Sequence, residues 1–403
     1  MENNKIINVT SDVKWIGILD YDLVTFDVVM TTEYGSTYNS YFIDADKKTI
    51  IDTSKETFWD DYEAKVRAVT NPEEIEYIIL NHTEPDHSGN LKNMLALAPN
   101  ATVVASVAGI KYLKDMLHQD FKHLVVRDGD TLDLGNKTLR FISAPNLHWP
   151  DTMYTYLEEE KLLFTCDSFG SHFADERMFD DKVDDFNPAF RYYFDVIIKP
   201  FSKFMLKAIE KIEVLEIDMI LPGHGPMLRE NWKRFVDMTK MWSEKFVAQP
   251  HKNKVFIPYV SAYHKTGVIA EYIAEGLKKA GDFEIEVLDI EQLPLGVLDM
   301  KLTQSAAIIV GSPVINQNIL LPIYKLFSLI NPYRDKGKLA GGFGSFGWSG
   351  ENKKLLETNL TNLKLKYFGE GVFVKFGPGD EEIEKAIEYG MNFGNELNKI
   401  AQS

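Results

Sequence analysis

The sequence predicts an α/β protein of two domains, in which a mixed α/β domain precedes a doubly wound parallel sheet. The chain has 403 residues, more than one hydrophobic core usually organises. A polar stretch with a proline at 248–254 divides it, and we expect domains at 1–249 and 250–403. Beyond that stretch, strand-like runs alternate with helical patterns, which indicates a parallel sheet with helices on both faces.

Before the boundary, four strand-like runs each lead into a polar loop that holds a potential metal ligand. These runs are 77–80, 139–143, 162–166 and 218–221. A hairpin is expected over 153–157 and 161–165, and helices over 199–215 and 232–246. Pro200 lies near the start of its helix, where proline is tolerated.

After the boundary the expected elements follow one another in regular order. The strands are 255–260, 284–288, 306–310, 339–343 and 372–376, and the helices are 268–279, 321–329, 353–363 and 381–400. Ligands of such sheets bind beyond the carboxyl ends of the strands. The loops after 255–260, 306–310 and 339–343 are therefore candidates for a binding site.

The composition narrows the range of partners. The chain is 45% apolar and 26% charged, and 44 basic against 60 acidic side chains give a net charge of −16. We expect so acidic a surface to avoid nucleic acids and membranes, and the absence of a signal-like start predicts a cytoplasmic protein. Cys166 is the only cysteine, so disulfides, cysteine-bound zinc and iron–sulfur clusters are excluded within the chain.

A dense group of potential ligands follows the first of these strands. His82 and Glu84 are two residues apart and would project together from an extended chain. Asp86 and His87 follow where Pro85 must turn the chain. One loop could therefore supply ligands to two adjacent metals.

Three further ligands are expected at the later strand ends, namely His148, Asp167 and His224. Each alone is more often a capping or core residue, but together they bring the total to four imidazoles and three carboxylates. That number suffices for two metals, and Asp167 is suited to bridging them because a carboxylate has two oxygens.

This pattern resembles the H-x-H-x-D-H loop of the metallo-β-lactamase superfamily, with Glu84 at the second histidine. A harder, anionic ligand at that position favours iron over zinc. The string H-x-E-x-D-H with the three later ligands resembles the diiron site of the flavodiiron proteins. The resemblance implies one iron on His82, Glu84 and His148, another on Asp86, His87 and His224, and Asp167 between them.

His172 and Tyr193 resemble catalytic pocket residues beside the metals of that family, although an ordinary hydrogen-bonded role is an equally good interpretation. His172 could donate a hydrogen bond or a proton to bound oxygen.

Residues 261–267 join a strand to a helix, so hydroxyl and backbone N–H groups would converge on an anion. The loop lacks G-x-x-x-x-G-K-[ST], which argues against a nucleoside triphosphatase. It resembles the phosphate loop of flavodoxins, and the matching residues are Ser261, Tyr263, Lys265 and Thr266. His264 occupies a position where that family commonly has glycine.

Two later loops resemble those that hold the flavin ring in flavodoxins, with Trp348 as an aromatic face and Asn316 as a donor. The residues concerned are Ser312, Pro313, Val314, Ile315, Asn316 and Gln317 in one loop, and Ser345, Phe346, Gly347, Trp348 and Gly350 in the other. Residues 342–347 also match G-x-G-x-x-G, but they follow the fourth strand and no acidic ribose partner lies about 20 residues later.

The resemblance to flavodiiron proteins covers the whole chain and implies a metallo-β-lactamase-like αββα domain followed by a flavodoxin-like domain. It implies FMN, two iron ions, and reduction of O₂ to water or of NO to N₂O in an anaerobe or microaerophile, and we favour O₂. A head-to-tail homodimer or homotetramer is implied as well. Because Cys166 is alone, the electron donor must be external: rubredoxin, a flavin reductase or a reduced deazaflavin coenzyme.

Two other functions remain open at this stage. A dizinc hydrolase would use a metal-bound hydroxide, but Glu84 and the flavodoxin-like domain count against it. A pure electron carrier with a degenerate first domain would not need seven ligands.

Overall fold

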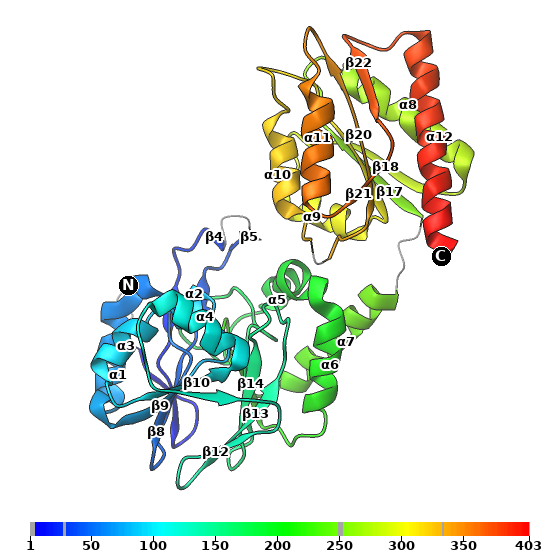
Figure 1. Ribbon diagram of the computed structural model, residues 1–403. Coiled ribbons are helices and arrows are strands. Elements are labelled where there is room, and N and C mark those ends of the chain that lie inside the picture. The colour runs from blue at the N-terminus through cyan, green and yellow to red at the C-terminus, as the bar shows by residue number, and fades with distance from the viewer. Residues whose placement is uncertain (1–4, 27–29, 249–252, 333, 403) are drawn as a thin grey trace. The chain divides into compact units, whose positions relative to one another are not determined.

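A computed structural model describes the chain except residues 1–4, 27–29, 249–252, 333 and 403. The chain divides into two compact units, Met1–Ala248 and Gln249–Ser403, here called the first and second units (Figure 1). The expected boundary between residues 249 and 250 falls outside the described residues.

Two sheets form the centre of the first unit. In one the strands run in the order β1 (Ile7–Asn8), β2 (Val13–Trp15), β7 (Tyr41–Ile43), β8 (Lys48–Ile51), β9 (Ile75–Ile79), β10 (Thr102–Ser106) and β11 (His123–Val126). In the other the order is β12 (Thr131–Asp133), β13 (Thr138–Ser143), β14 (Met153–Leu157), β15 (Leu162–Cys166) and β16 (Met219–Pro222). Two short pairs accompany them, β3 (Ile18–Asp20) with β6 (Ser36–Tyr38) and β4 (Thr25–Phe26) with β5 (Met30–Thr31).

Helices cover the outer face of each sheet. On the first sheet lie α1 (Trp59–Val69), α3 (Leu91–Leu97) and α4 (Val107–Leu117), and on the second lie α5 (Asn187–Tyr193), α6 (Ser202–Ile212) and α7 (Trp232–Ala248). Short helical turns complete the unit: α2 (Pro85–Ser88), η1 (Glu56–Phe58), η2 (Pro72–Glu74), η4 (Lys199–Phe201) and the π-helical η3 (Phe194–Ile198). Each sheet shares an apolar core with its helices. A further apolar core, which includes Val104 and Phe164, lies between the two sheets. The layers are therefore αββα, as expected.

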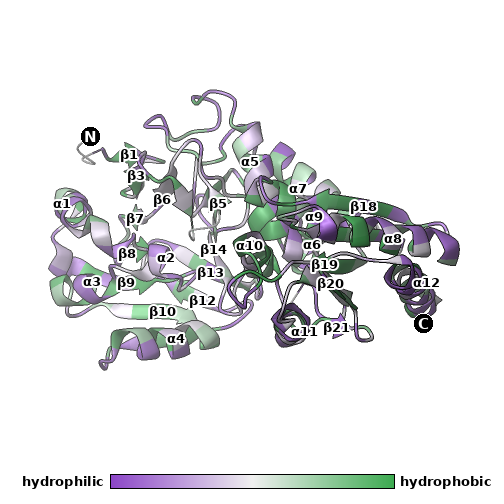
Figure 2. Cartoon of the chain, turned by 90° about the horizontal axis from the view of Figure 1, so that it is seen from above, coloured by the Kyte–Doolittle hydropathy of each residue, from purple (hydrophilic) through white to green (hydrophobic). Residues whose placement is uncertain are grey.

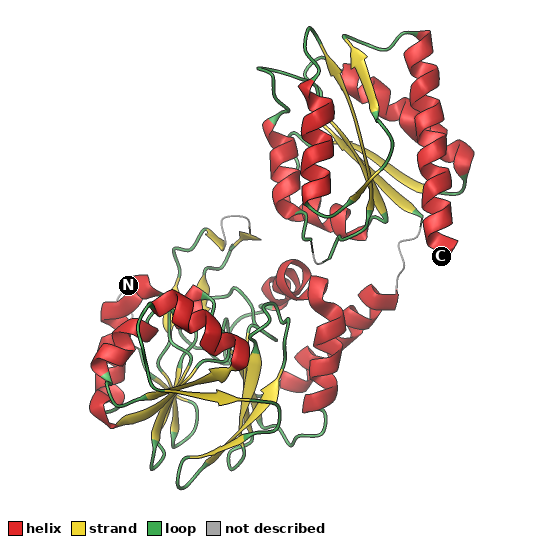
Figure 3. Cartoon of the chain, viewed as in Figure 1, coloured by secondary structure: helices red, strands yellow, loops and turns green. Residues whose placement is uncertain are grey.

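The second unit has one parallel sheet in the order β18 (Glu284–Asp289), β17 (Lys254–Tyr259), β19 (Ala307–Gly311), β20 (Leu339–Phe346) and β21 (Lys366–Tyr367), and β22 (Val372–Lys375) also pairs with β20. Helices α8 (Lys265–Ala280) and α12 (Asp380–Gln402) pack on one face, and α9 (Leu295–Gln304), α10 (Leu321–Leu329) and α11 (Glu351–Asn362) on the other (Figure 3). This arrangement confirms the doubly wound parallel sheet.

The amphipathic patterns explain why these helices form. In Figure 2 they carry both hydrophilic and hydrophobic residues, as expected of helices with one face against a sheet. The hairpin β14–β15 is as expected, whereas the helix expected over 199–215 begins with the turn η4 and ends at Ile212. None of the described helices has the length and apolarity to span a membrane.

Candidate diiron and flavin sites

The loop after β9 turns where Pro85 stands. Its first part is extended, and Pro85 then opens the single helical turn α2, so Asp86 and His87 leave the chain in a new direction. Asp52 accepts a hydrogen bond of 2.8 Å from the backbone N of Asn81, and Ser88 Oγ donates to the backbone O of Thr83 at 2.8 Å. These bonds hold both ends of the loop.

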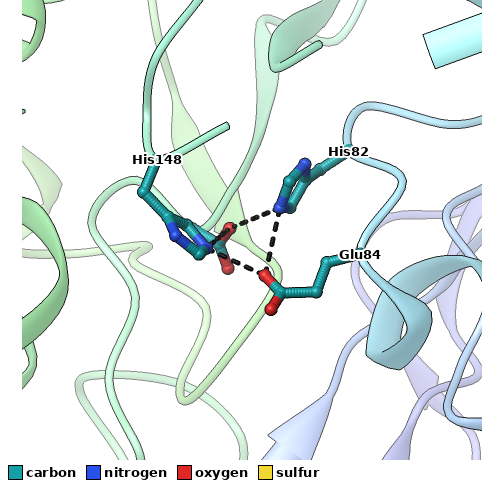
Figure 4. Close-up of side chains that lie close together, drawn as sticks. His82, Glu84 and His148 are labelled. Atoms are coloured by element: carbon teal, nitrogen blue, oxygen red, sulfur yellow. Dashed lines mark hydrogen bonds and ion pairs between the residues drawn. The ribbon is translucent and has the colours of Figure 1, made fainter. Parts of the chain in front are cut away.

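All seven predicted ligands lie close together at the ends of the strands. Ligand atoms of one group, His82, Glu84, His148 and Asp167, lie within 4.8 Å of one another, as do those of a second group, Asp86, His87 and His224. Figure 4 shows the side chains of His82, Glu84 and His148 pointing toward one another, and Glu84 Oε2 lies 3.2 Å from His82 Nε2 and 2.9 Å from His148 Nε2.

Asp167 faces both groups with different oxygens. Its Oδ2 lies 3.5 Å from Nε2 of both His82 and His148. Its Oδ1 lies 3.1 Å from His87 Nε2 and 3.4 Å from His224 Nε2. A carboxylate that bridges two metals needs this placement. The assignment of each ligand to one or the other iron stays a prediction.

The donor atoms suit two metal ions. Asp86 Oδ1 is buried and has no hydrogen-bond partner among the described residues, and the nearest charged groups to Asp86 Oδ2 and Asp167 Oδ2 are imidazoles of the other predicted ligands. Buried carboxylate oxygens without partners are costly unless a cation or a donor reaches them. Oxygen and imidazole nitrogen together suit iron. His87 and Asp167 also group with Cys166, but burial raises the pKa of that thiol well above its ordinary value, which keeps it protonated.

Charges within the cluster shift several pKa values. Burial opposes protonation of His224, but Asp167 and Asp86 outweigh it and raise the pKa of His224 to about 10. Asp167 and Glu84 likewise outweigh burial and raise the pKa of His148 to about 9. Burial alone would raise the pKa of Asp167. His87, His148 and His224 outweigh that effect and hold the pKa well below its ordinary range.

These shifts predict how pH acts on the metal-free protein. The folded pKa values of His148 and His224 exceed the ordinary 6.5, so their ion pairs stabilise the metal-free fold below pH 6.5. That contribution is lost as the pH rises through about 9 and 10, while metal binding requires neutral imidazoles and becomes easier. The gap in melting temperature between iron-loaded and metal-free protein should therefore widen from pH 6.5 to 9. Anaerobic calorimetry measures it, and a constant gap would contradict the prediction.

Sequence reasoning missed Asp151, which supports a predicted ligand. Its Oδ2 lies 3.1 Å from His82 Nδ1 and accepts bonds from Thr83 N at 2.7 Å and Thr83 Oγ1 at 2.8 Å. A carboxylate on the far nitrogen of a metal-binding histidine fixes the orientation of the ring and strengthens the ligand. The only sequence signal was an acidic residue three positions after His148.

The two predicted pocket residues also lie beside the metal ligands. Tyr193 donates a hydrogen bond of 3.1 Å to Asp167 Oδ1, and burial followed by the charge of Asp167 raises its pKa well above the ordinary value. The ring of His172 lies 5.2 Å from that of His224, and its Nε2 has no partner among the described residues. Ser36 Oγ hydrogen-bonds His172 Nδ1 at 2.8 Å, and the ring of Phe26 lies 4.5 Å from the His172 ring. Neither Ser36 nor Phe26 was predicted.

In the second unit the three predicted flavin loops meet at the carboxyl ends of β17, β19 and β20. Thr266 Oγ1, in the first turn of α8, lies 3.0 Å from Ser345 Oγ. Strand β20 runs on to Phe346, so Ser345 and Phe346 stand at its end and not in the loop expected after residue 343. The backbone N of Val314 donates to Ser345 O at 3.1 Å, which joins the second loop to the end of β20. Ser261 Oγ accepts a weak bond of 3.4 Å from Gly267 N at the start of α8.

The remaining residues of these loops differ in exposure. Buried members are Ser312, Pro313 and Ser345; partly buried ones are Val314, Phe346 and Gly347; exposed ones are Ile315, Asn316, Gln317 and Gly350. Tyr263 and Trp348 are 81% and 87% exposed, so both aromatic rings are free to face a flavin. Lys265 opens α8, and its side chain passes close to Gly377. His264 has φ +59°, a left-handed conformation, which explains why glycine suits that position.

Thr266 provides a test of the flavin site. The Thr266→Ala variant should lose flavin more readily, by about 10-fold in dissociation constant, because it removes one buried hydroxyl at the helix N-terminus. Iron content should not change, since the ligands lie in the other unit. Fluorimetric flavin titration measures the effect, with the exposed Thr361→Ala as control; equal flavin affinity in both variants would contradict it.

Comparisons with known proteins agree with this architecture. A sequence profile described as "ODP family beta lactamase" matches residues 37–225, and one described as "Flavodoxin" matches residues 257–390. The flavo-diiron protein FprA2 of Clostridium acetobutylicum is 38% identical over 97% of this chain and 99% of that protein. The nitric oxide reductase of Moorella thermoacetica is 33% identical over 95% of this chain and 97% of that protein.

Solved structures are similar over the same span. Rubredoxin oxygen:oxidoreductase from Desulfovibrio gigas superposes with a TM-score of 0.74 at 28% identity and covers 99% of this chain and 100% of that one. The flavodiiron protein from Giardia intestinalis gives a TM-score of 0.72 at 30% identity, with 99% and 98% covered.

An αββα unit with a dinuclear ligand cluster and a flavodoxin unit together define a metal- and flavin-dependent oxidoreductase. The chain belongs to the flavodiiron protein family, and its cofactors are FMN and a diiron centre.

Proposed function

We propose that this chain reduces O₂ to water with electrons from an external donor. Four electrons and four protons convert one O₂ into two waters. When bound, FMN and the two irons supply the redox chemistry. The observation that carries the proposal is the placement of Asp167, whose two oxygens face two separate groups of ligands.

The ligand charges support iron in this cluster. Glu84, Asp86 and Asp167 contribute three carboxylates, which offset much of the charge of two ferric ions. Every ligand side chain except Glu84 and His148 is less than 9% exposed on its surface, so bulk water is largely excluded. Exclusion of water limits the escape of partly reduced oxygen.

His172 supports O₂ as the substrate. Its buried Nε2 lacks a partner, and its ring lies beside His224, so it can donate a hydrogen bond to an oxygen species held between the ligand groups. The same geometry would also serve NO, and the relative from Moorella thermoacetica is named a nitric oxide reductase.

Matched turnover assays test the substrate. Anaerobically purified protein with a chemically reduced donor should consume O₂ faster than NO. Much faster turnover of NO would overturn the O₂ proposal and favour formation of N₂O. Two zincs and no iron in protein expressed with both metals available would instead indicate a hydrolase.

The His172→Ala variant should slow O₂ consumption by about 100-fold or raise the release of hydrogen peroxide, because a hydrogen-bond donor beside the reacting oxygen is lost. Iron content should stay at the wild-type value, since His172 is not among the grouped ligands. The exposed His123→Ala serves as control. An unchanged rate without peroxide release would show that His172 has only a structural role.

The physiological donor and the assembly are proposed from the family. We propose a rubredoxin, a flavin reductase or a reduced deazaflavin coenzyme as donor, a head-to-tail homodimer or homotetramer, and the cytoplasm as location. Stopped-flow reduction of the FMN by each candidate donor discriminates among the donors. Sedimentation analysis distinguishes a homodimer from a homotetramer.

A further inference from the structure

The backbone segment around His224 is a loop without regular secondary structure. His224 lies between Gly223 and Gly225, directly after β16, and Gly225 has φ +76°. A Cβ at Gly223 would come within 2.7 Å of His87 Cε1, and one at Gly225 within 2.2 Å of Ser171 Oγ. Residues 222–225, here called the His224 loop, are therefore tightly packed and depend on neighbours for their position.

Asn39 holds the His224 loop on both sides of the ligand. Its side-chain Nδ2 donates to Pro222 O at 2.8 Å and to Gly225 O at 2.9 Å, and its backbone N donates to Gly223 O at 2.8 Å. Its Oδ1 accepts a bond of 2.8 Å from Trp15 Nε1. Two carbonyl groups on one side and an indole N–H on the other admit only one orientation of this amide.

The surrounding contacts make Asn39 a rigid support. The side chain is fully buried, and Trp15, which fixes its oxygen, is also fully buried with Lys65 Nζ 4.7 Å from its ring centre. The neighbouring Thr37 accepts from His224 Nδ1 through its backbone O at 2.5 Å and from Gly225 N through Oγ1 at 2.7 Å. Thr37 thus orients the imidazole ring, whereas Asn39 fixes the backbone on which the ring stands.

We propose that Asn39 is a positioning residue for one of the two metals, the one on Asp86, His87 and His224. It acts through the His224 loop and touches no metal. The other group takes no ligand from this loop, since His82, Glu84 and His148 lie elsewhere in the chain. The inference rests on the proposed dinuclear site and extends it to the N-terminal part of the chain.

The Asn39→Asp variant is the sharpest test. Aspartate has the same shape and still accepts from Trp15, but it cannot donate, so the carbonyl groups of Pro222 and Gly225 would face a carboxylate oxygen. Binding of the metal on His224 should weaken by about 10- to 100-fold. Total iron should fall from two to about one per chain, with one of two Mössbauer signals lost and flavin content unchanged.

Trp15→Phe is the matched control in the same unit. It removes the bond to Asn39 Oδ1 and disturbs the same core, but it leaves both donations to the His224 loop in place. This variant should keep two irons. The proposal is overturned if Asn39→Asp binds both irons as tightly as wild type or loses both together. It is also overturned if Trp15→Phe loses iron to the same extent as Asn39→Asp.

The readout separates this inference from the proposed function. If the wild type held two zincs, the oxygen-reductase proposal would fail, but selective loss of one zinc from Asn39→Asp would still support the role of Asn39. Retention of both zincs by that variant would overturn it.

Discussion

Replacing Asp167 by Ala is expected to release both irons and abolish turnover. Its two oxygens face separate ligand groups, so the change removes a bond and a share of negative charge from both metals. Metal binding should weaken by more than about 100-fold, the upper range for residues that only support a ligand. Elemental analysis together with Mössbauer spectroscopy measures the loss.

Asp180→Asn provides the control for removal of a buried carboxylate. Asp180 lies in the same unit and accepts backbone N–H bonds from Arg229, Glu230 and Asn231, away from the ligand groups. This variant should keep both irons. Full iron content and activity in Asp167→Ala would show that the bridging assignment is wrong.

Replacing Asp151 by Ala should weaken the metal on His82 by about 10- to 100-fold, since His82 Nδ1 loses its carboxylate partner. The Asn variant keeps an acceptor for His82 and Thr83 but removes the charge, so it should have a smaller effect. Iron titration monitored by Mössbauer spectroscopy should show that the metal on His82, Glu84 and His148 is lost before the metal on Asp86, His87 and His224.

The exposed Asp128→Ala controls for the loss of one negative charge in the first unit. Together with Asn39→Asp, these variants should deplete the two metals in opposite order. If Asp151→Ala released both irons equally, Asp151 would act on the stability of the whole cluster.

The second unit shows what local sequence patterns reveal and what they miss. Alternating strand and helix patterns predicted the parallel sheet, because its central strands β17 and β19 are buried apolar runs. Helix α9 (Leu295–Gln304) was missed because its apolar side chains are spread around the helix and form no clear stripe. Packing explains why the helix forms: its own side chains Leu298 and Leu302 are buried in the apolar core on that face of the sheet.

The candidate diiron site was predictable as a set of residues but not as a geometry. The run from His82 to His87 places four potential ligands within six residues of one loop, and the later ligands follow apolar strand-like runs. Only the folded chain shows which oxygen of Asp167 faces which group.

The sequence by itself determined the two-part organisation and the parallel sheet, because each leaves a local pattern of periodicity. It also predicted the candidate metal and flavin residues, from their spacing and from a family resemblance. The tertiary structure decided which side chains support those residues. Asn39 meets the His224 loop across more than 180 residues, and Asp151 meets His82 across 69. These hydrogen bonds join single polar residues, which leave no periodic pattern in the sequence. They form only when packing brings distant backbone segments together.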